Sequence, residues 1–256
     1  MRFRPLRPAS APDATPVAVA DPPETMRAAV IDATGGTDAL HEASVAVPTP
    51  ILSELLVRVV AAGVPLAALT AWGLVVETAH AHEGQRMLIH AGSGGVGHFA
   101  VQFAAYFGAH VTATGSSRNA SWLRELGASV VIDHSTTRFE DVIADVDVVI
   151  DLVGNVHEKT GERSLTVVRP GGLYILVPTG SWPGYTEAAA DAGVRATGYK
   201  VIPDGSTLAT IGRLLDSGAV QVYIDRVFDL KDAAAAHTAL EEGHTRGKIV
   251  LRVSDD

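Results

Sequence analysis

The sequence predicts an α/β fold built on a doubly wound parallel sheet, the Rossmann arrangement. Short apolar runs alternate with stretches of helical periodicity through most of the chain, which is typical of a parallel sheet covered by helices on both faces. One stretch, residues 86–119, reads as strand, glycine turn, helix and strand. Its turn has the sequence GSGGVG, which matches the G-x-G-x-x-G fingerprint of dinucleotide sites in the structural context that the fingerprint requires.

The composition limits the partners that the protein can have. With 256 residues, of which 47% are hydrophobic, the chain can bury a sizeable core in one or two domains. Its net charge of −9 argues against non-specific nucleic-acid binding and against an anionic membrane surface. Cysteine is absent, which excludes disulfides and cysteine zinc sites and fits a reducing compartment. We expect a cytoplasmic protein with a small-molecule substrate and no membrane or nucleic-acid partner.

The N-terminal quarter is predicted to hold few regular elements. Residues 1–25 are rich in Pro, Ala and Asp without periodicity, so we expect a disordered leader there. From Met26 onward the sequence predicts strands over 27–33 and 54–64 and an extended segment over 45–50. A helix follows over 65–79, because Pro65 is tolerated at the first helical position.

Strands and helices then alternate to the end of the chain. Strands are predicted where short runs rich in β-branched residues recur, over 87–90, 110–114, 130–132, 147–151, 172–177, 194–201, 221–228 and 248–253. Helices are predicted between them, over 96–107, 122–126, 138–144, 158–168, 186–191, 206–217 and 231–242. Gly108 and Gly127 mark the ends of the first two of these helices.

The glycine turn is the strongest candidate site. Glycines allow a tight turn and a close approach to a pyrophosphate, and the helix that follows directs N–H groups toward it. The predicted contacts are Gly92, Ser93, Gly94, Gly95, Val96 and Gly97. The alternative interpretation is a glycine-rich turn without a ligand.

The end of the second strand indicates which dinucleotide binds. NAD sites usually place an acid there to hold the ribose 2′-hydroxyl, but Ser116, Ser117 and Arg118 occupy these positions here. Two hydroxyls and a guanidinium suit a 2′-phosphate, which favours NADPH over NADH. Alternatively, Ser117 is an ordinary N-cap of the next helix; both roles are compatible.

Two further loops follow strands of the predicted sheet. Ligands in open α/β sheets lie beyond the carboxyl ends of the strands, so these loops are expected to border the nicotinamide. The predicted contacts are Val153, Gly154, Val177, Pro178 and Thr179. The alternative is that both loops are ordinary connections without a ligand.

No catalytic side chain can be assigned from the sequence. No tyrosine lies in a recognisable motif, so the proton donor stays unknown. His80, His82 and Glu83 lie in a polar loop without an identifiable third ligand. We therefore predict no metal site. The absence of a G-x-S-x-G motif argues against a serine hydrolase.

Several motifs together resemble one family. They are PLAALTAW (65–72), GQ (84–85), HAGSGGVGHFAVQFA (90–104), LRELGA (123–128), DLVG (151–154), RPGG (169–172) and GHTRGKIVL (243–251). The chain resembles the medium-chain dehydrogenase/reductase superfamily in its zinc-independent quinone oxidoreductase (zeta-crystallin-like) branch. The resemblance implies NADPH, hydride transfer to a quinone or an α,β-unsaturated carbonyl, and a cofactor contact by the loop that carries Arg246 and Lys248. It also implies a homodimer paired through the sheet edge at residues 194–201.

The chain departs from this family at one place. In the family a long stretch of the catalytic domain separates the equivalents of Val64 and Pro65, which are adjacent here. We therefore predict an internally truncated, mainly β catalytic domain over 26–64 and 220–256, and a dinucleotide-binding Rossmann domain over 65–219. Three functions stay open: an NADPH-dependent quinone or enone reductase, an NADP(H)-binding sensor or scaffold without redox catalysis, and a repurposed nonredox enzyme of secondary metabolism.

Overall fold

The computed structural model describes residues 24–31, 39–46 and 63–252 of the chain. The predicted leader lies almost wholly outside these residues, as does most of the strand predicted over 54–64. In the third described range, Val64 leads directly into the helix α1, Pro65–Trp72. This helix continues as a π-helical segment, η3, Gly73–Thr78, so the predicted helix over 65–79 is confirmed in its extent.

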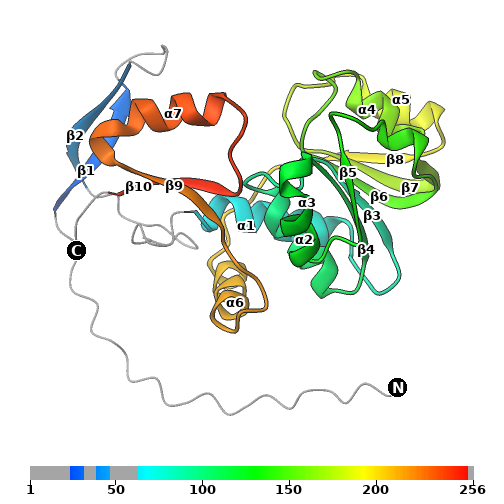
Figure 1. Ribbon diagram of the computed structural model, residues 1–256, viewed down its shortest axis with the longest axis horizontal. Coiled ribbons are helices and arrows are strands. Elements are labelled where there is room, and N and C mark those ends of the chain that lie inside the picture. Colours follow the sequence, from blue (N-terminus) through cyan, green and yellow to red (C-terminus); the bar gives the residue numbers. More distant parts are fainter. Residues whose placement is uncertain (1–23, 32–38, 47–62, 253–256) are drawn as a thin grey trace.

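A six-stranded parallel sheet organises the part of the molecule on the right in Figure 1. Its strand order is β5-β4-β3-β6-β7-β8, and every pair is parallel. The strands are β3 (Arg86–Ile89), β4 (His110–Gly115), β5 (Val130–Asp133), β6 (Val146–Asp151), β7 (Val168–Leu176) and β8 (Arg195–Gly198). The order reverses between β3 and β6, which is the switch point of a doubly wound sheet. The predicted fold class is therefore confirmed.

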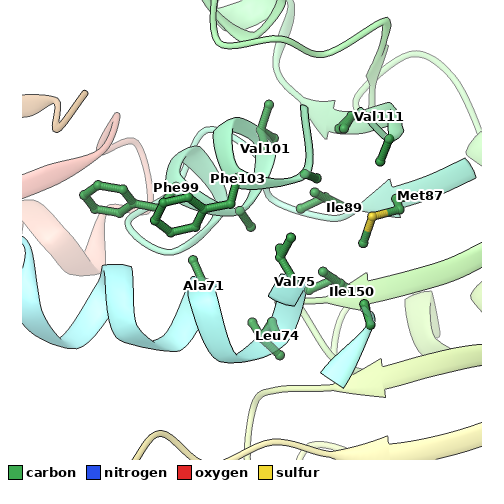
Figure 2. Packing of buried hydrophobic residues seen from close by; sticks show 14 of the residues in the cluster. Ala71, Leu74, Val75, Met87, Ile89, Phe99, Val101, Phe103, Val111 and Ile150 are labelled. Carbon is green, nitrogen blue, oxygen red and sulfur yellow. The ribbon is translucent and has the colours of Figure 1, made fainter. Parts of the chain in front are cut away.

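Helices cover both faces of this sheet because alternate strand residues point to opposite sides. On one face, α2 (Gly97–Tyr106) and α1 pack against the sheet with α3 (Ala120–Glu125) and α6 (Gly205–Asp216). Figure 2 shows this core, in which Phe99 and Phe103 of α2 lie near Ile89 and Val75. On the other face, α4 (Thr160–Leu165) and α5 (Tyr185–Asp191) cover a second core around Tyr174.

The remaining strands form two small sheets beside the main one. The antiparallel hairpin of β1 (Thr25–Ile31) and β2 (Leu40–Ala46) lies near α7 (Ala233–Glu241). The strands β9 (Ile224–Asp229) and β10 (Lys248–Arg252) pair in parallel, with α7 as their connection. All six strands of the main sheet fall within the predicted dinucleotide-binding domain, residues 65–219; the domain boundaries themselves stay predictions.

Three predicted elements differ from the structure. The helix predicted over 138–144 is only a 3₁₀ turn, Phe139–Asp141, because Arg138 is extended and Val142 leaves the helical region. The helix predicted over 158–168 is reduced to α4, because Glu158 and Lys159 have positive φ and Val168 enters β7. The strand predicted over 194–201 is shortened to β8. Short segments are decided by tertiary contacts that sequence patterns do not contain.

Candidate dinucleotide-binding site

The glycine turn joins the carboxyl end of β3 to α2. A methyl group on Gly97 would lie 2.1 Å from the carbonyl oxygen of Ala91, so the packing of the helix against the strand end requires glycine there. A methyl group on Gly94 would meet only that same oxygen within 4 Å, at 3.3 Å. Gly94 therefore leaves the backbone open to a ligand, as the corresponding glycine does in a pyrophosphate site.

Backbone donors are available on this turn. The turn is closed by Gly94 N–H, which donates to Ala91 O at 3.0 Å, and by Gly92 N–H, which donates to Thr114 O at 2.9 Å. The N–H groups of Ser93, Gly95 and Val96 donate to no acceptor within the described part of the chain. Because α2 begins directly afterwards, its dipole adds positive potential at the same point. The turn thus fits a pyrophosphate.

Two adjoining cavities flank the turn at the point where the strand order reverses. The larger, about 790 Å³, is bordered by the ends of β3 and β4, the loop after β5 and the start of α4. The smaller, about 460 Å³, is bordered by the glycine turn, the loops after β6 and β7 and the segment between α7 and β10. The residues that line both are Ala91, Gly94, Gly243 and Thr245. A long ligand can therefore lie across the turn with one end in each cavity.

The structure brings most of the predicted cofactor residues to these cavities. The residues that line one cavity or both are Ser93, Gly94, Gly95, Val96, Gly97, Val153, Val177, Pro178 and Lys248. Gly92, Gly154 and Thr179 lie in the same loops without lining either cavity. Ser116, Ser117 and Arg118 line neither cavity, but they directly follow Gly115, which lines the larger one; we call this stretch, with Asp133 across from it, the rim of the larger cavity.

Asp151 shapes the loop after β6. It is fully buried, and its Oδ1 accepts hydrogen bonds from the N–H groups of Val153 and Gly154, both at 2.8 Å. Its Oδ2 accepts a hydrogen bond from the hydroxyl of Tyr174 at 2.6 Å. Burial, with the Asp151 charge nearby, raises the pKa of Tyr174 well above its usual value. Tyr174 therefore acts as a fixed donor that holds this loop, not as a proton source.

His90 connects the base of the glycine turn to α4. Its Nε2 lies 2.9 Å from Ser164 Oγ, which itself donates to Thr160 O, so Nε2 carries the proton. Its Nδ1 then accepts from Thr114 Oγ1 at 3.2 Å, and that oxygen accepts the N–H of Ala91. Burial lowers the pKa of His90 to about 4. A neutral histidine thus ties β3, β4 and α4 together beneath the larger cavity.

A second buried histidine fixes the start of α2. His98 Nδ1 donates to Gly94 O at 3.0 Å, and its Nε2 faces the N–H of Tyr223 at 3.5 Å. Burial lowers the pKa of His98 to about 4, and the charge of Lys248 acts in the same direction. His98 is therefore neutral and holds the carbonyl oxygen of Gly94. This contact uses none of the N–H groups of the turn.

The segment between α7 and β10 closes over the glycine turn. Gly247 N–H donates to Ser93 O at 2.9 Å. Lys248 lies against Gly95, where a methyl group would be 3.0 Å from its Cδ and 3.2 Å from its Nζ. Burial lowers the pKa of Lys248, and its ammonium forms no ion pair with a described acid. A half-buried cation without a counterion at this position suits a phosphate.

Thr245 is a candidate contact that sequence reasoning missed. Its hydroxyl is buried and has no hydrogen-bond partner among the described residues. Thr245 lines both cavities. Because a buried hydroxyl without a partner is costly, this atom is free for a ligand group placed between the cavities.

Arg246, by contrast, makes its contacts with other residues of the protein. Its Nε donates to Asn119 Oδ1 at 2.9 Å, and its guanidinium lies 5.2 Å from the ring centre of Trp122 and 5.5 Å from that of Tyr223. These contacts join the C-terminal segment to the start of α3. Direct contact of Arg246 with a cofactor stays a prediction, and its geometry supports a positioning role.

The rim of the larger cavity holds the predicted 2′-phosphate residues. Arg118 is exposed, and its Nη2 donates to His244 O at 2.7 Å. The N–H of Ser117 donates to Asp133 Oδ2 at 3.1 Å. An acid that is absent at the end of β4 is thus present at the end of the neighbouring strand β5. The sequence places Asp133 after a strand near the expected adenine, but its contact with Ser117 depends on the pairing of β4 with β5, which is a tertiary contact.

The comparisons with known proteins agree with this geometry. The family profile of zinc-binding dehydrogenases matches residues 126–251. The mitochondrial NAD(P)H oxidoreductase RTN4IP1 of Danio rerio is 30% identical over 223 residues, covering 77% of this chain and 57% of that protein. The solved structure of the quinone oxidoreductase from Coxiella burnetii superposes with a TM-score of 0.72 at 37% identity, over 76% of this chain and 60% of that one. The chain belongs to the medium-chain dehydrogenase/reductase superfamily.

Two further proteins are similar to this chain over a comparable share of its length. The 2-methylene-furan-3-one reductase of Solanum lycopersicum is 35% identical over 196 residues, covering 75% of this chain and 46% of that protein. The mycobacterial protein Rv1454c, solved in complex with NADPH, superposes with a TM-score of 0.68 at 28% identity, over 81% of this chain and 67% of that one. The chain spans about half the length of the curated relatives that it matches.

The matching profile is named for zinc, but the described residues hold no cluster of three or more His, Asp or Glu side chains with metal-binding geometry. In the loop where the sequence places two histidines, His82 Nδ1 lies 3.0 Å from the carbonyl oxygen of His80.

None of the helices in the described ranges is long and apolar enough to cross a membrane.

Proposed function

We propose that this chain is an NADPH-dependent oxidoreductase that transfers a hydride to a quinone or an α,β-unsaturated carbonyl compound. The observation that carries the proposal is the glycine turn between two cavities, with Gly94 open to a ligand and unpaired N–H donors beside it. Relatives named as NAD(P)H oxidoreductase and quinone oxidoreductase support the reaction class. NADPH would supply the hydride, and the protein would bind and orient the reactants.

Each part of the site has a role in holding the cofactor. The N–H groups of Gly95 and Val96 and the ammonium of Lys248 suit the pyrophosphate. The hydroxyl of Thr245, at the junction of the cavities, suits a ribose hydroxyl or a phosphate oxygen. Ser116, Ser117 and Arg118 are the proposed contacts of the 2′-phosphate. The remaining predicted contacts, Gly92, Gly154 and Thr179, would act by shaping the loops.

The smaller cavity suits the nicotinamide and the substrate. Its border includes Leu152, Val177, Pro178, Leu240 and Ile249, which are apolar. Such a border excludes water from one side of the reacting atoms, which favours hydride transfer over side reactions. Thr245 and Lys248 also border this cavity, but we assign both to the cofactor, so in our proposal the proton comes from water or from the cofactor ribose. The reaction is zinc-independent in this proposal.

Steady-state kinetics test the proposal. The family segment missing between Val64 and Pro65 would form a wall of the substrate pocket, so we expect turnover of large polycyclic quinones and poor turnover of small enones. Orientation of reactants can lower a barrier by ~7–11 kcal/mol, so a lost wall has a large effect. NADPH oxidation with a polycyclic quinone beside a small enone is the measurement. A small enone with kcat/KM above ~10⁴ M⁻¹s⁻¹ would contradict the open pocket.

The same missing segment favours a second function, an NADP(H)-binding sensor or scaffold without redox catalysis. It predicts tight NADPH binding with no turnover across the substrate panel. A nonredox enzyme of secondary metabolism would instead convert a substrate without consuming NADPH. The three outcomes differ in binding and turnover, so one set of assays separates them.

We also propose a cytoplasmic homodimer. The strand β8 lies at the edge of the main sheet with β7 as its neighbour, and an edge strand can pair with a second copy. Light scattering at micromolar concentration should give twice the mass of one chain, 26.7 kDa. A mass of one chain would contradict the dimer.

A further inference from the structure

One carboxylate, that of Asp133, lies at the rim of the larger cavity. Asp133 ends β5 and lies directly across from Gly115, the last residue of β4, in the parallel register. Gly115 lines the larger cavity, and so do His134 and Ser135, the two residues after Asp133. Asp133 therefore lies next to the cavity border, because it pairs with Gly115 on β4 and directly precedes His134 in the chain.

Both oxygens of this carboxylate hold donors of the rim. Oδ2 accepts the N–H of Ser117 at 3.1 Å. Oδ1 accepts the N–H of Ser135 at 2.9 Å and its hydroxyl at 2.7 Å. Two donors that an incoming phosphate would use, Ser117 N–H and the Ser135 hydroxyl, are already engaged.

No basic residue within the described ranges neutralises the charge of Asp133. Hydrogen bonds from Ser135 lower the pKa of Asp133, so it is ionised at neutral pH. It forms no ion pair with a described basic residue, and the nearest predicted cation of the rim, Arg118, is directed to the carbonyl of His244. An incoming 2′-phosphate carries between about one and two negative charges at pH 7, so it meets a like charge with no counterion placed between them.

We propose that Asp133 sets the ratio of NADPH to NADH binding in this chain, by opposing the 2′-phosphate and by withholding the N–H of Ser117 from it. This inference rests on the proposed function, because it assumes that adenosine lies in the larger cavity. Arg118 favours NADPH, and Asp133 reduces that preference so that both dinucleotides bind. An adenosine 2′-hydroxyl, which is a donor, can still use the free lone pairs of the carboxylate.

The exchange Asp133→Asn tests the inference. The amide oxygen keeps the acceptor for Ser135, while the amide nitrogen cannot accept the N–H of Ser117 and offers a donor in its place. Dissociation constants for NADPH and NADH would be measured by calorimetry on the full chain. We expect NADPH to bind about fivefold to tenfold more tightly, because a like charge is removed and a donor is released. NADH should bind equally or more weakly.

Asp204→Asn is the matched control. Asp204 binds the N–H and hydroxyl of Ser206 with the same spacing, at 3.0 and 2.9 Å, but it caps α6 and lines neither cavity. The exchange Asp204→Asn removes the same charge and should leave the ratio of NADPH affinity to NADH affinity unchanged. Ser135→Ala removes one hydrogen bond of Asp133, that of the hydroxyl, while keeping its charge and the bond from the backbone N–H, and it should give a smaller gain than Asp133→Asn.

The outcomes separate this inference from the proposed function. If NADPH binding to a folded Asp133→Asn protein is unchanged or weaker, or if both affinities change by one factor, the inference is wrong while the cofactor site stands. If the wild-type chain binds neither dinucleotide, the proposed function and the inference fail together. Should Asp133→Asn unfold, Asp133→Ser provides a second uncharged variant with the same expected shift.

Discussion

The two ends of the candidate site are built in different ways. At the pyrophosphate end, the glycine turn is made of backbone, and its shape is fixed by the contact between Gly97 and Ala91. At the 2′ end, the rim depends on contacts between side chains and distant parts of the chain: the Asp133 carboxylate accepts the backbone N–H of Ser117, and the Arg118 guanidinium donates to the carbonyl of His244. A backbone site is encoded locally, whereas a side-chain rim depends on which neighbours the fold brings to it. The following predictions test this difference.

The largest expected effect is on stability at the backbone end. Gly97→Val would place side-chain atoms against the Ala91 carbonyl, which cannot move without breaking the turn. We expect the free energy of unfolding to fall by at least about 3 kcal/mol, measured by urea denaturation. Gly212→Ala, in an open position in the middle of α6, is the control and should stabilise by about 0.5–1 kcal/mol. Equal stability of Gly97→Val and the wild type would disprove the packing role.

The two buried histidines predict a loss of stability in acid. The pKa of His90 and of His98 is lowered to about 4 in the folded chain, against about 6.5 when unfolded. Below pH ~6.5 the unfolded state binds protons that the folded state does not, so stability falls progressively between about pH 6.5 and pH 4. The loss should be roughly 3 kcal/mol per histidine.

Unfolding free energies at pH 7 and pH 5 measure this effect. His90→Asn should remove part of the pH dependence, whereas replacing the exposed His110 should not. An identical pH dependence in His90→Asn and the wild type would show that His90 is not buried in its neutral form.

The smallest effect is expected at the side-chain rim. Arg118→Ala should weaken NADPH binding about tenfold and leave NADH nearly unchanged, because a charged hydrogen bond to phosphate is worth ~1.5–3 kcal/mol. Arg124→Ala, an exposed arginine of the adjacent α3, is the control. If NADPH and NADH lose affinity equally, Arg118 does not contact the 2′-phosphate.

The sequence predicted the parts of the molecule that local patterns encode. The strands of the main sheet, the glycine turn and the loops after β6 and β7 follow from apolar periodicity and from glycine at fixed spacing, whereas the full strand order is a finding of the structure. The sequence places Asp133 and Asp151 at the ends of strands, but their contacts and the role of Thr245 were not predicted, because these arise from residues more than ten positions away or across the sheet. The helix predicted at 138–144 failed for the same reason: Phe139 is buried against His90, and Glu140 is held by Arg163.

The most direct test of the account is NADPH binding to Gly94→Val, measured by calorimetry beside the wild type. A side chain at Gly94 meets little in the protein but would fill the space that a pyrophosphate needs. We predict a folded protein, with a melting temperature close to that of the wild type, that has lost detectable NADPH affinity. A folded Gly94→Val protein that binds NADPH as tightly as the wild type would contradict the assignment of the glycine turn as the cofactor site.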